Sequence, residues 1–303
     1  WMTLGYSQID SPLAGIAPVA GVYGVSTALL LSAAALIAAA LSTSRRRRAF
    51  AALAVVPWVL GYALQQIEWT QPAGSSIRTT IVQGGISQDQ KWLPEQFPTT
   101  LNLYRNATVG GQNHELVVWP EVALPATIDQ IENYLASIEA ELAVNSQSLV
   151  LGILERDFGT QAIYNSVLML NGRDRQTYRK RHLVPFGEYF PVPDFVRNWM
   201  RLMSLPNSDM TPGEPVQPLL ETASGQKLAV AICYEDAYGA EQLYALPEAG
   251  MLINVSNDAW FGDTIAPHQH LEIARMRALE VGRYMVRATN NGVSAFVDDK
   301  GRI

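Results

Sequence analysis

The single cysteine of this chain stands where a nucleophile could be held. Leu228 to Ile232 form an apolar run that predicts a strand, and Cys233 follows it directly. Amides at the beginning of a following helix and a nearby cation can lower the pKa of such a thiol and prepare it for attack. A small buried hydrophobe is the other common role of a lone cysteine, and position alone favours neither role.

Two charged residues could complete a site around this thiol. Glu121 follows the apolar run Leu116 to Trp119 and Pro120, at the end of a predicted strand, where open α/β sheets place their sites. Lys180 lies among three adjacent cations and, like Glu121, reads as surface charge when taken alone. Together, a thiol, a carboxylate and an ammonium group provide the nucleophile, proton acceptor and oxyanion partner that acyl transfer requires.

Short apolar runs and amphipathic stretches alternate after residue 70, and this alternation predicts an α/β domain whose sheet is covered by helices. Spacings of three and four between Ile128 and Leu142 predict a helix, as does the stretch from Pro267 to Gly282. Asn171-Gly172 is a pair that a tight hairpin prefers. The predicted strands are 77–82, 115–119, 149–154, 163–170, 227–232, 251–255 and 284–289.

The first 70 residues are poor in charge and predict a membrane segment. Residues 13–41 contain no charged side chain and exceed the roughly 20 residues needed to cross hydrocarbon. Arg45 to Arg48 separate them from a second, more marginal apolar run at 49–69, whose alternative is a buried core helix. A basic block between two apolar runs predicts two transmembrane helices joined by a cytoplasmic loop, with the domain at 71–303 outside the cytoplasm.

The composition of the chain excludes several functional classes. It is 48% hydrophobic and 17% charged with a formal net charge of −6, so it lacks the basic surface that nucleic-acid binding requires. One cysteine excludes an intramolecular disulfide framework. His268, His270 and Glu272 could form a metal trio, but their context predicts the first turn of a helix, and we expect no metal.

Three sequence contexts carry a family resemblance. They are Trp119-Pro120-Glu121, the run from Arg179 to Glu188, and Ile232-Cys233-Tyr234-Glu235. They resemble the carbon-nitrogen hydrolase (nitrilase) superfamily, and the resemblance covers nearly the whole chain. Soluble nitrilases lack the membrane hairpin, so the chain looks most like the membrane-bound branch whose members N-acylate lipoproteins.

The resemblance implies a role for seven residues. Glu121 matches the base, Lys180 the lysine that stabilises the oxyanion, and Cys233 the nucleophile. The supporting or substrate-binding positions that it implies are Glu188, Tyr234, Glu235 and, in a loop over the site, Trp92.

The resemblance also implies a fold, substrates and a location. The fold is a four-layer α-β-β-α sandwich attached to membrane helices, of which this chain would lack the first and the last. The catalytic domain at 71–303 would then be incomplete at its C-terminal end. A membrane phospholipid would donate the acyl group and a diacylglyceryl apolipoprotein would accept it, without cofactor or metal. The enzyme would be a multi-pass protein of the bacterial inner membrane with its catalytic domain on the periplasmic side.

An amphipathic stretch near residue 200 supports lipid contact independently of the family. Its apolar face would contain Phe195, Val196, Trp199, Met200, Leu202 and Met203. Such a stretch is typical of an arm that dips into the membrane interface, and its alternative is a helix packed on the domain's own core. Two functional alternatives remain at this point, a membrane-tethered amidase or nitrilase that releases its acyl group to water, and a binding protein without catalysis.

Overall fold

The computed structural model describes residues 2–109, 114–193, 195–196 and 210–303. The chain forms two compact units, and each is described by itself. Unit 1 consists of Trp1–Gly74, Ile265–Met285 and Phe296–Ile303, and unit 2 of Ser75–Thr264 and Val286–Ala295. All seven residues to which the family resemblance assigns a role therefore belong to unit 2.

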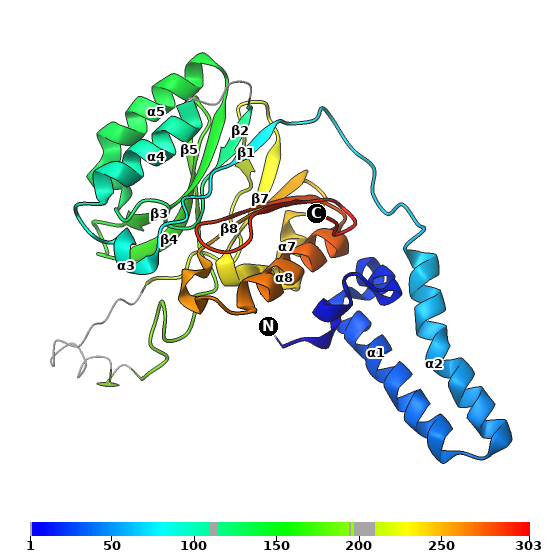
Figure 1. Ribbon diagram of the computed structural model, residues 1–303. Coiled ribbons are helices and arrows are strands. Elements are labelled where there is room, and N and C mark those ends of the chain that lie inside the picture. Colours follow the sequence, from blue (N-terminus) through cyan, green and yellow to red (C-terminus); the bar gives the residue numbers. More distant parts are fainter. Residues whose placement is uncertain (1, 110–113, 194, 197–209) are drawn as a thin grey trace. The chain divides into compact units, whose positions relative to one another are not determined.

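Unit 1 contains a pair of long apolar helices, α1 (Ala17–Leu41) and α2 (Ser44–Leu64), which pack against each other (Figure 1). Two short 3-10 helices, η1 (Leu4–Gln8) and η2 (Pro12–Ile16), precede them. Both long helices have the length and composition needed to cross a membrane. The arginines expected between the two apolar runs form the beginning of α2 instead, because arginine is a good helix former, and α2 ends at Leu64 rather than near residue 69.

A kink in α1 is tied to the third helix of unit 1, α8 (Ala266–Val281). Gly21 has a φ of 65°, which interrupts the helix, and Glu280 accepts a hydrogen bond from the backbone N–H of Val22 at 2.6 Å. Arg277 also donates to Glu280, at 3.0 Å. Burial raises the pKa of Glu280, although Arg277 opposes the shift. A buried carboxylate therefore satisfies the amide that the glycine kink leaves without a helical partner.

Unit 2 contains all of one sheet and most of a second. The first has the order β1-β2-β3-β4-β5, with β1 (Thr79–Ile81), β2 and β3 parallel and β4 and β5 antiparallel to their neighbours. The bounds of the other four strands are Leu116–Val118 (β2), Ser148–Arg156 (β3), Ile163–Leu170 (β4) and Arg175–Arg179 (β5). The second sheet has the order β10-β9-β8-β7-β6, and β7 and β8 are parallel. Its strands are β6 (Leu220–Glu221), β7 (Lys227–Ile232), β8 (Met251–Ser256), β9 (Tyr284–Thr289) and β10 (Ala295–Val297).

Successive side chains along the strands face two different cores. Val117 contributes to a core shared with helices α4 (Phe97–Val109) and α5 (Glu132–Val144), which cover the first sheet (Figure 1). Leu116 and Val118 point the other way, into a core shared with β7 and β8 of the second sheet. This alternation follows from the period of two in a β-strand. The prediction of an α/β fold is confirmed as two facing sheets with helices on the outer face of the first.

The predicted elements are present with small shifts of their bounds. The helix expected at 128–142 is η3 (Ile128–Ile131) followed by α5, and the helix expected at 267–282 is α8. The hairpin at Asn171-Gly172 has a four-residue connection, in which the Asn171 side chain accepts hydrogen bonds from the amides of Arg173 and Asp174. Hydrophobic periodicity did not predict α4, β5, β6 or β10.

A close approach between β3 and the segment after β2 places Glu121. Gly152 accepts a hydrogen bond from the amide of Ala123 and donates one to the carbonyl of Pro120. A Cβ atom at Gly152 would lie 2.4 Å from the Pro120 carbonyl oxygen and 2.5 Å from the Glu121 Cα. Only glycine allows the two backbones this separation.

We expect Gly152→Ala to lower the free energy of unfolding by about 1 to 3 kcal/mol, because the added methyl group must displace backbone atoms. Thermal and denaturant unfolding of the variant would measure the loss. Gly159→Ala is the control, since its Cβ would approach only the Asp157 carboxylate, at 3.2 Å, on an exposed turn. Equal stability of the two variants would contradict the inferred close approach.

Candidate active site

Glu121 lies in a buried and strained turn after β2. Its side chain is 9% exposed, and the following residue, Val122, has a φ of 43°, which a β-branched residue rarely adopts. One carboxylate oxygen, Oε1, accepts hydrogen bonds from Asn165 Nδ2 at 2.8 Å and Lys180 Nζ at 3.2 Å. The turn therefore directs a carboxylate inward, toward polar groups of β4 and β5.

Lys180 is the first residue after β5 and is buried, with 1% of its side chain exposed. Its ammonium lies between two carboxylates, because it also donates to Glu188 Oε1 at 2.8 Å. Burial alone would lower the pKa of this ammonium, but the charges of Glu121 and Glu188 hold the pKa above its usual range. Lys180 is therefore charged at neutral pH, as an oxyanion partner must be.

Asn165 on β4 joins the two glutamates and was not identified from the sequence. Its Nδ2 donates to Oε1 of both Glu121 and Glu188, at 2.8 and 2.9 Å. Its carbonyl accepts the Lys180 amide at 2.8 Å, which continues the β4 and β5 pairing beyond Arg179. The sequence signal was a polar residue inside a predicted strand that is otherwise apolar. Such a residue indicates a buried side chain with hydrogen-bond partners, and it does not by itself indicate a catalytic role.

Cys233 follows β7 directly, as expected, and begins the 3-10 helix η4 (Cys233–Ala237). Its φ of 50° lies in the left-handed region, which is uncommon for a residue other than glycine. The thiol interacts electrostatically with both Glu121 and Lys180. The structure therefore brings the three predicted residues together at the ends of β2, β5 and β7.

The pKa of the Cys233 thiol is shifted upward, in the opposite direction from the sequence expectation. Burial is the largest cause, the Glu121 carboxylate adds to it, and Lys180 only partly offsets the two. The strand-end amides and the cation do not create a preformed thiolate. A neutral thiol must lose its proton in order to attack, and the Glu121 carboxylate is an adjacent group that can accept it.

Glu235 connects the ends of β5 and β7. It accepts hydrogen bonds from the backbone amides of Ile232 at 2.7 Å and Arg181 at 2.6 Å, and from the Tyr178 hydroxyl at 2.9 Å. Burial raises the pKa of Glu235, and the two backbone amides oppose the shift. Ile232 directly precedes Cys233, and Arg181 directly follows Lys180. Because the amides of both bind one carboxylate, Glu235 determines how Cys233 and Lys180 are placed.

Tyr234 and Trp92 are less buried than Glu121 and Lys180. The Tyr234 ring packs edge-on against Tyr238, with centroids 5.2 Å apart. Trp92 follows the single turn α3 (Gln88–Lys91), is 52% exposed, and lines a cavity of about 370 Å³ with Phe97 and Pro125. An exposed aromatic ring beside a cavity is suited to ligand contact rather than to bond making.

Lys91, next to Trp92, is a second buried lysine that sequence reasoning did not identify. It is 3% exposed, and its Nζ donates to the backbone carbonyl of Glu121 at 3.4 Å. Burial lowers its pKa to about 8, with Glu121 acting in the opposite direction. The contact holds α3 against the turn that contains Glu121.

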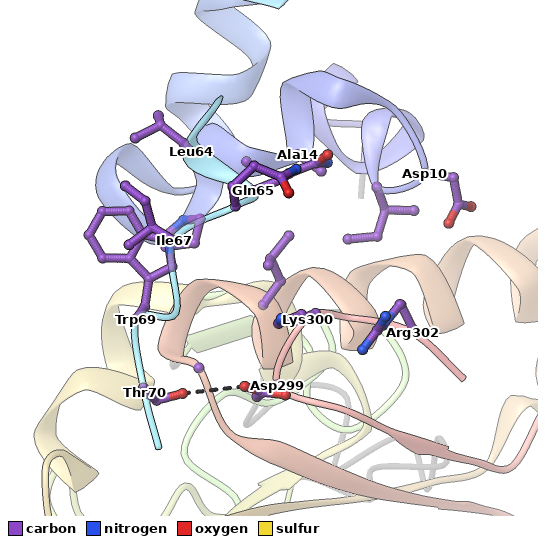
Figure 2. A pocket seen from close by; sticks show the side chains of 16 residues that line it. Asp10, Ala14, Leu64, Gln65, Ile67, Trp69, Thr70, Asp299, Lys300 and Arg302 are labelled. Atoms are coloured by element: carbon purple, nitrogen blue, oxygen red, sulfur yellow. Dashed lines mark hydrogen bonds between the residues drawn. The ribbon is translucent and has the colours of Figure 1, made fainter. Parts of the chain in front are cut away.

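The structure also locates the other features predicted from the sequence. Phe195 is exposed and Val196 is half-buried, but the residues of the predicted arm from 197 to 203 lie outside the described residues. His268, His270 and Glu272 lie in α8, as their helical context predicted. Unit 1 has a cavity of about 430 Å³ near the end of α2, where Thr70 donates to Asp299 at 3.4 Å (Figure 2).

The electrostatics of the thiol predict its reactivity. Iodoacetamide should alkylate Cys233 slowly near neutral pH, and the rate should still rise above pH 9, because the thiol pKa exceeds its usual 9.0. Glu121→Gln should lower the thiol pKa and accelerate alkylation at fixed pH, whereas Lys180→Met should slow it, by a factor of about ten per pKa unit. Alkylation rates followed by intact mass would test this, and a wild-type plateau below pH 8 would contradict it.

Comparisons with known proteins show which families this chain resembles. Residues 78–303 match the carbon-nitrogen hydrolase family, and residues 1–35 match the apolipoprotein N-acyltransferase N-terminal domain. The whole chain is 45% identical to the apolipoprotein N-acyltransferase of Nitrosomonas europaea and 44% identical to that of Methylococcus capsulatus. It spans 61% and 60% of the lengths of these two relatives.

Solved structures show the same fold. A CN-hydrolase superfamily protein from Xanthomonas campestris aligns with a TM-score of 0.53 at 17% identity, covering 75% of this chain and 84% of that one. Nit3 of Saccharomyces cerevisiae, a member of the nitrilase superfamily, aligns with a TM-score of 0.52 at 22% identity, with the same coverage. Since the family match extends over most of the chain, from residue 78 to residue 303, this protein belongs to the carbon-nitrogen hydrolase family.

Proposed function

We propose that this protein is an apolipoprotein N-acyltransferase. It would transfer an acyl chain from a membrane phospholipid, through a thioester on Cys233, to the α-amino group of the diacylglyceryl-cysteine that begins a lipoprotein. The names of the relatives that match the full chain support the reaction, and the match at residues 1–35 supports the membrane-bound branch. The buried cluster of Glu121, Lys180 and Cys233 is the observation that carries the proposal.

The first half of the reaction acylates the thiol. Cys233 attacks the ester carbonyl of the phospholipid while Glu121 accepts the thiol proton, as the raised thiol pKa requires. Lys180 and the backbone amide of Tyr234 stabilise the negative charge on the carbonyl oxygen. The C–O ester bond then breaks, Glu121 returns the proton to the departing oxygen, and a lysophospholipid leaves.

The second half transfers the acyl group to the lipoprotein. The α-amino group attacks the thioester carbonyl, Glu121 accepts a proton from the amine, and the same oxyanion partners act again. Breaking of the C–S bond releases the N-acylated product, and the thiol regains its proton. Glu188 accepts a hydrogen bond from Lys180, and Asn165 donates to both Glu121 and Glu188, so we assign Glu188 and Asn165 to positioning.

A membrane location fits substrates that both carry lipid anchors. The helices α1 and α2 have the length and composition of transmembrane segments, and residues 45–48 begin α2 with four arginines. The positive-inside rule places such a block in the cytoplasm. We therefore propose a multi-pass protein of the bacterial inner membrane whose unit 2 is on the periplasmic side.

The function is tested by mass spectrometry of the full-length protein incubated with phospholipid. Wild-type protein should gain the mass of one acyl chain on Cys233, and a synthetic diacylglyceryl lipopeptide should remove it. Glu121→Gln should slow thioester formation by about 100-fold or more, because the variant has no proton acceptor. Glu141→Gln, which removes a surface carboxylate paired with Arg105, is the matched control and should react normally.

Two results would contradict the proposal. A Glu121→Gln protein that forms the thioester at the wild-type rate would assign the proton transfer to another group, with Glu188 the first candidate. Loss of the acyl group to water at the same rate with and without lipopeptide would instead indicate a hydrolase.

The orientation in the membrane is tested by reporter fusions. A fusion after Ser44 should report the cytoplasm and a fusion after Gly225 the periplasm, because one membrane crossing by α2 separates them. The two reporters would be an alkaline phosphatase and a fluorescent protein, which are active on opposite sides. Activity of both fusions on one side would exclude the proposed orientation.

A further inference from the structure

A buried polar network lies directly behind the thiol, on strands of the second sheet. Strands β7 and β8 are parallel with Ile232 opposite Val255, so the next residues, Cys233 and Ser256, are neighbours at the ends of the two strands. Ser256 is fully buried and its hydroxyl forms a hydrogen bond with the Cys233 thiol. The same hydroxyl donates to Asp258 Oδ1 at 3.0 Å.

Arg287 on β9 fixes the other end of this network. It is fully buried and donates to Asp258 Oδ2 at 3.0 Å, and also to Asn254 and Asp236. Asn254 in turn donates to the backbone carbonyl of Cys233 at 3.4 Å. The network therefore contacts both the side chain and the backbone of the cysteine.

The chemistry of these groups limits where the serine hydroxyl can point. Buried charges are costly to separate, so the Arg287 and Asp258 pair keeps its geometry, and with it the acceptor of the Ser256 hydrogen. A neutral thiol leaves that hydrogen on Asp258. When Glu121 has removed the thiol proton, the sulfur becomes an anion within hydrogen-bond reach of the Ser256 hydroxyl, which can then turn its hydrogen toward the sulfur.

We propose that Ser256 is a positioning residue for the nucleophile, holding Sγ beside Glu121 and donating a hydrogen bond to the sulfur as its proton leaves. Asp258 and Arg287 hold Ser256 for this purpose. The inference rests on the proposed role of Cys233 as nucleophile. A donor to the ionised sulfur also opposes the effects of burial and of Glu121, both of which disfavour the thiolate.

The test compares two buried serines in the full-length protein. Ser256→Ala should slow alkylation of Cys233 by iodoacetamide at fixed pH by about tenfold, the effect of losing one hydrogen bond to a charged group. Thioester formation with phospholipid should slow by a similar factor in kcat, with KM unchanged because Ser256 does not touch the substrate. Ser148→Ala is the matched control, since Ser148 is also fully buried and accepts one hydrogen bond, from the Ala223 amide at 2.8 Å.

Two outcomes would overturn the inference. One is alkylation of the Ser256→Ala protein at the wild-type rate, and the other is an equal slowing in Ser148→Ala, which would indicate a general loss of packing. If Ser256→Ala does not fold, Ser256→Cys keeps the shape of the side chain but is a much weaker hydrogen-bond donor. Alkylation at position 233, followed by peptide mass mapping, should then be slowed by the same factor. A wild-type rate in that variant would overturn the inference equally.

The two readouts separate this inference from the proposed function. If the wild-type protein forms no thioester with phospholipid, the proposed function fails, while the alkylation rates still report whether Ser256 assists the thiolate. If the thioester forms but alkylation is the same in the wild-type and Ser256→Ala proteins, the function stands and the role of Ser256 is rejected.

Discussion

The rest of unit 2 depends on one interaction. The ammonium of Lys180 is buried between the carboxylates of Glu121 and Glu188 and pairs with both. A buried charge without a partner would be neutralised or exposed, so the two carboxylates must be held within hydrogen-bond distance of the lysine. The 3.2 and 2.8 Å contacts meet this requirement. Asn165 binds both carboxylates from β4 and keeps them together.

The facing sheets supply the geometry of this cluster. Gly152 lets the chain after β2 lie against β3, which turns Glu121 inward, and the pairing of β4 with β5 carries Lys180 to the same region. Cys233 follows a strand of the second sheet, and Glu235 accepts hydrogen bonds from one backbone amide at the end of β7 and one just after β5. A single carboxylate therefore connects the residue before Cys233 to the residue after Lys180.

The raised pKa of the thiol gives this arrangement its chemical meaning. A permanent thiolate would not need a base, but in the proposed acyl transfer a thiol that is neutral at rest needs an acceptor for its proton, and the Glu121 carboxylate would be that acceptor. Burial, which disfavours the thiolate, also strengthens the interactions with Lys180 and Ser256, which lower the thiol pKa. In the proposed reaction, the site would combine low reactivity at rest with support for the transition state.

The sequence by itself determined the α/β class, the two long apolar helices and the strand-end positions of Glu121 and Cys233, because hydrophobic periodicity is a local property of the chain. It also contained the motif residues Glu188 and Glu235, although only by resemblance. Tertiary structure decided which groups meet. Asn165, Lys91 and Ser256 act on partners distant in the chain, so no local pattern marks them, and the direction of the thiol pKa shift depends on burial and on a carboxylate from another strand. Packing of the folded chain brings these side chains into contact with their partners, and their hydrogen bonds and effects on pKa arise only from that contact.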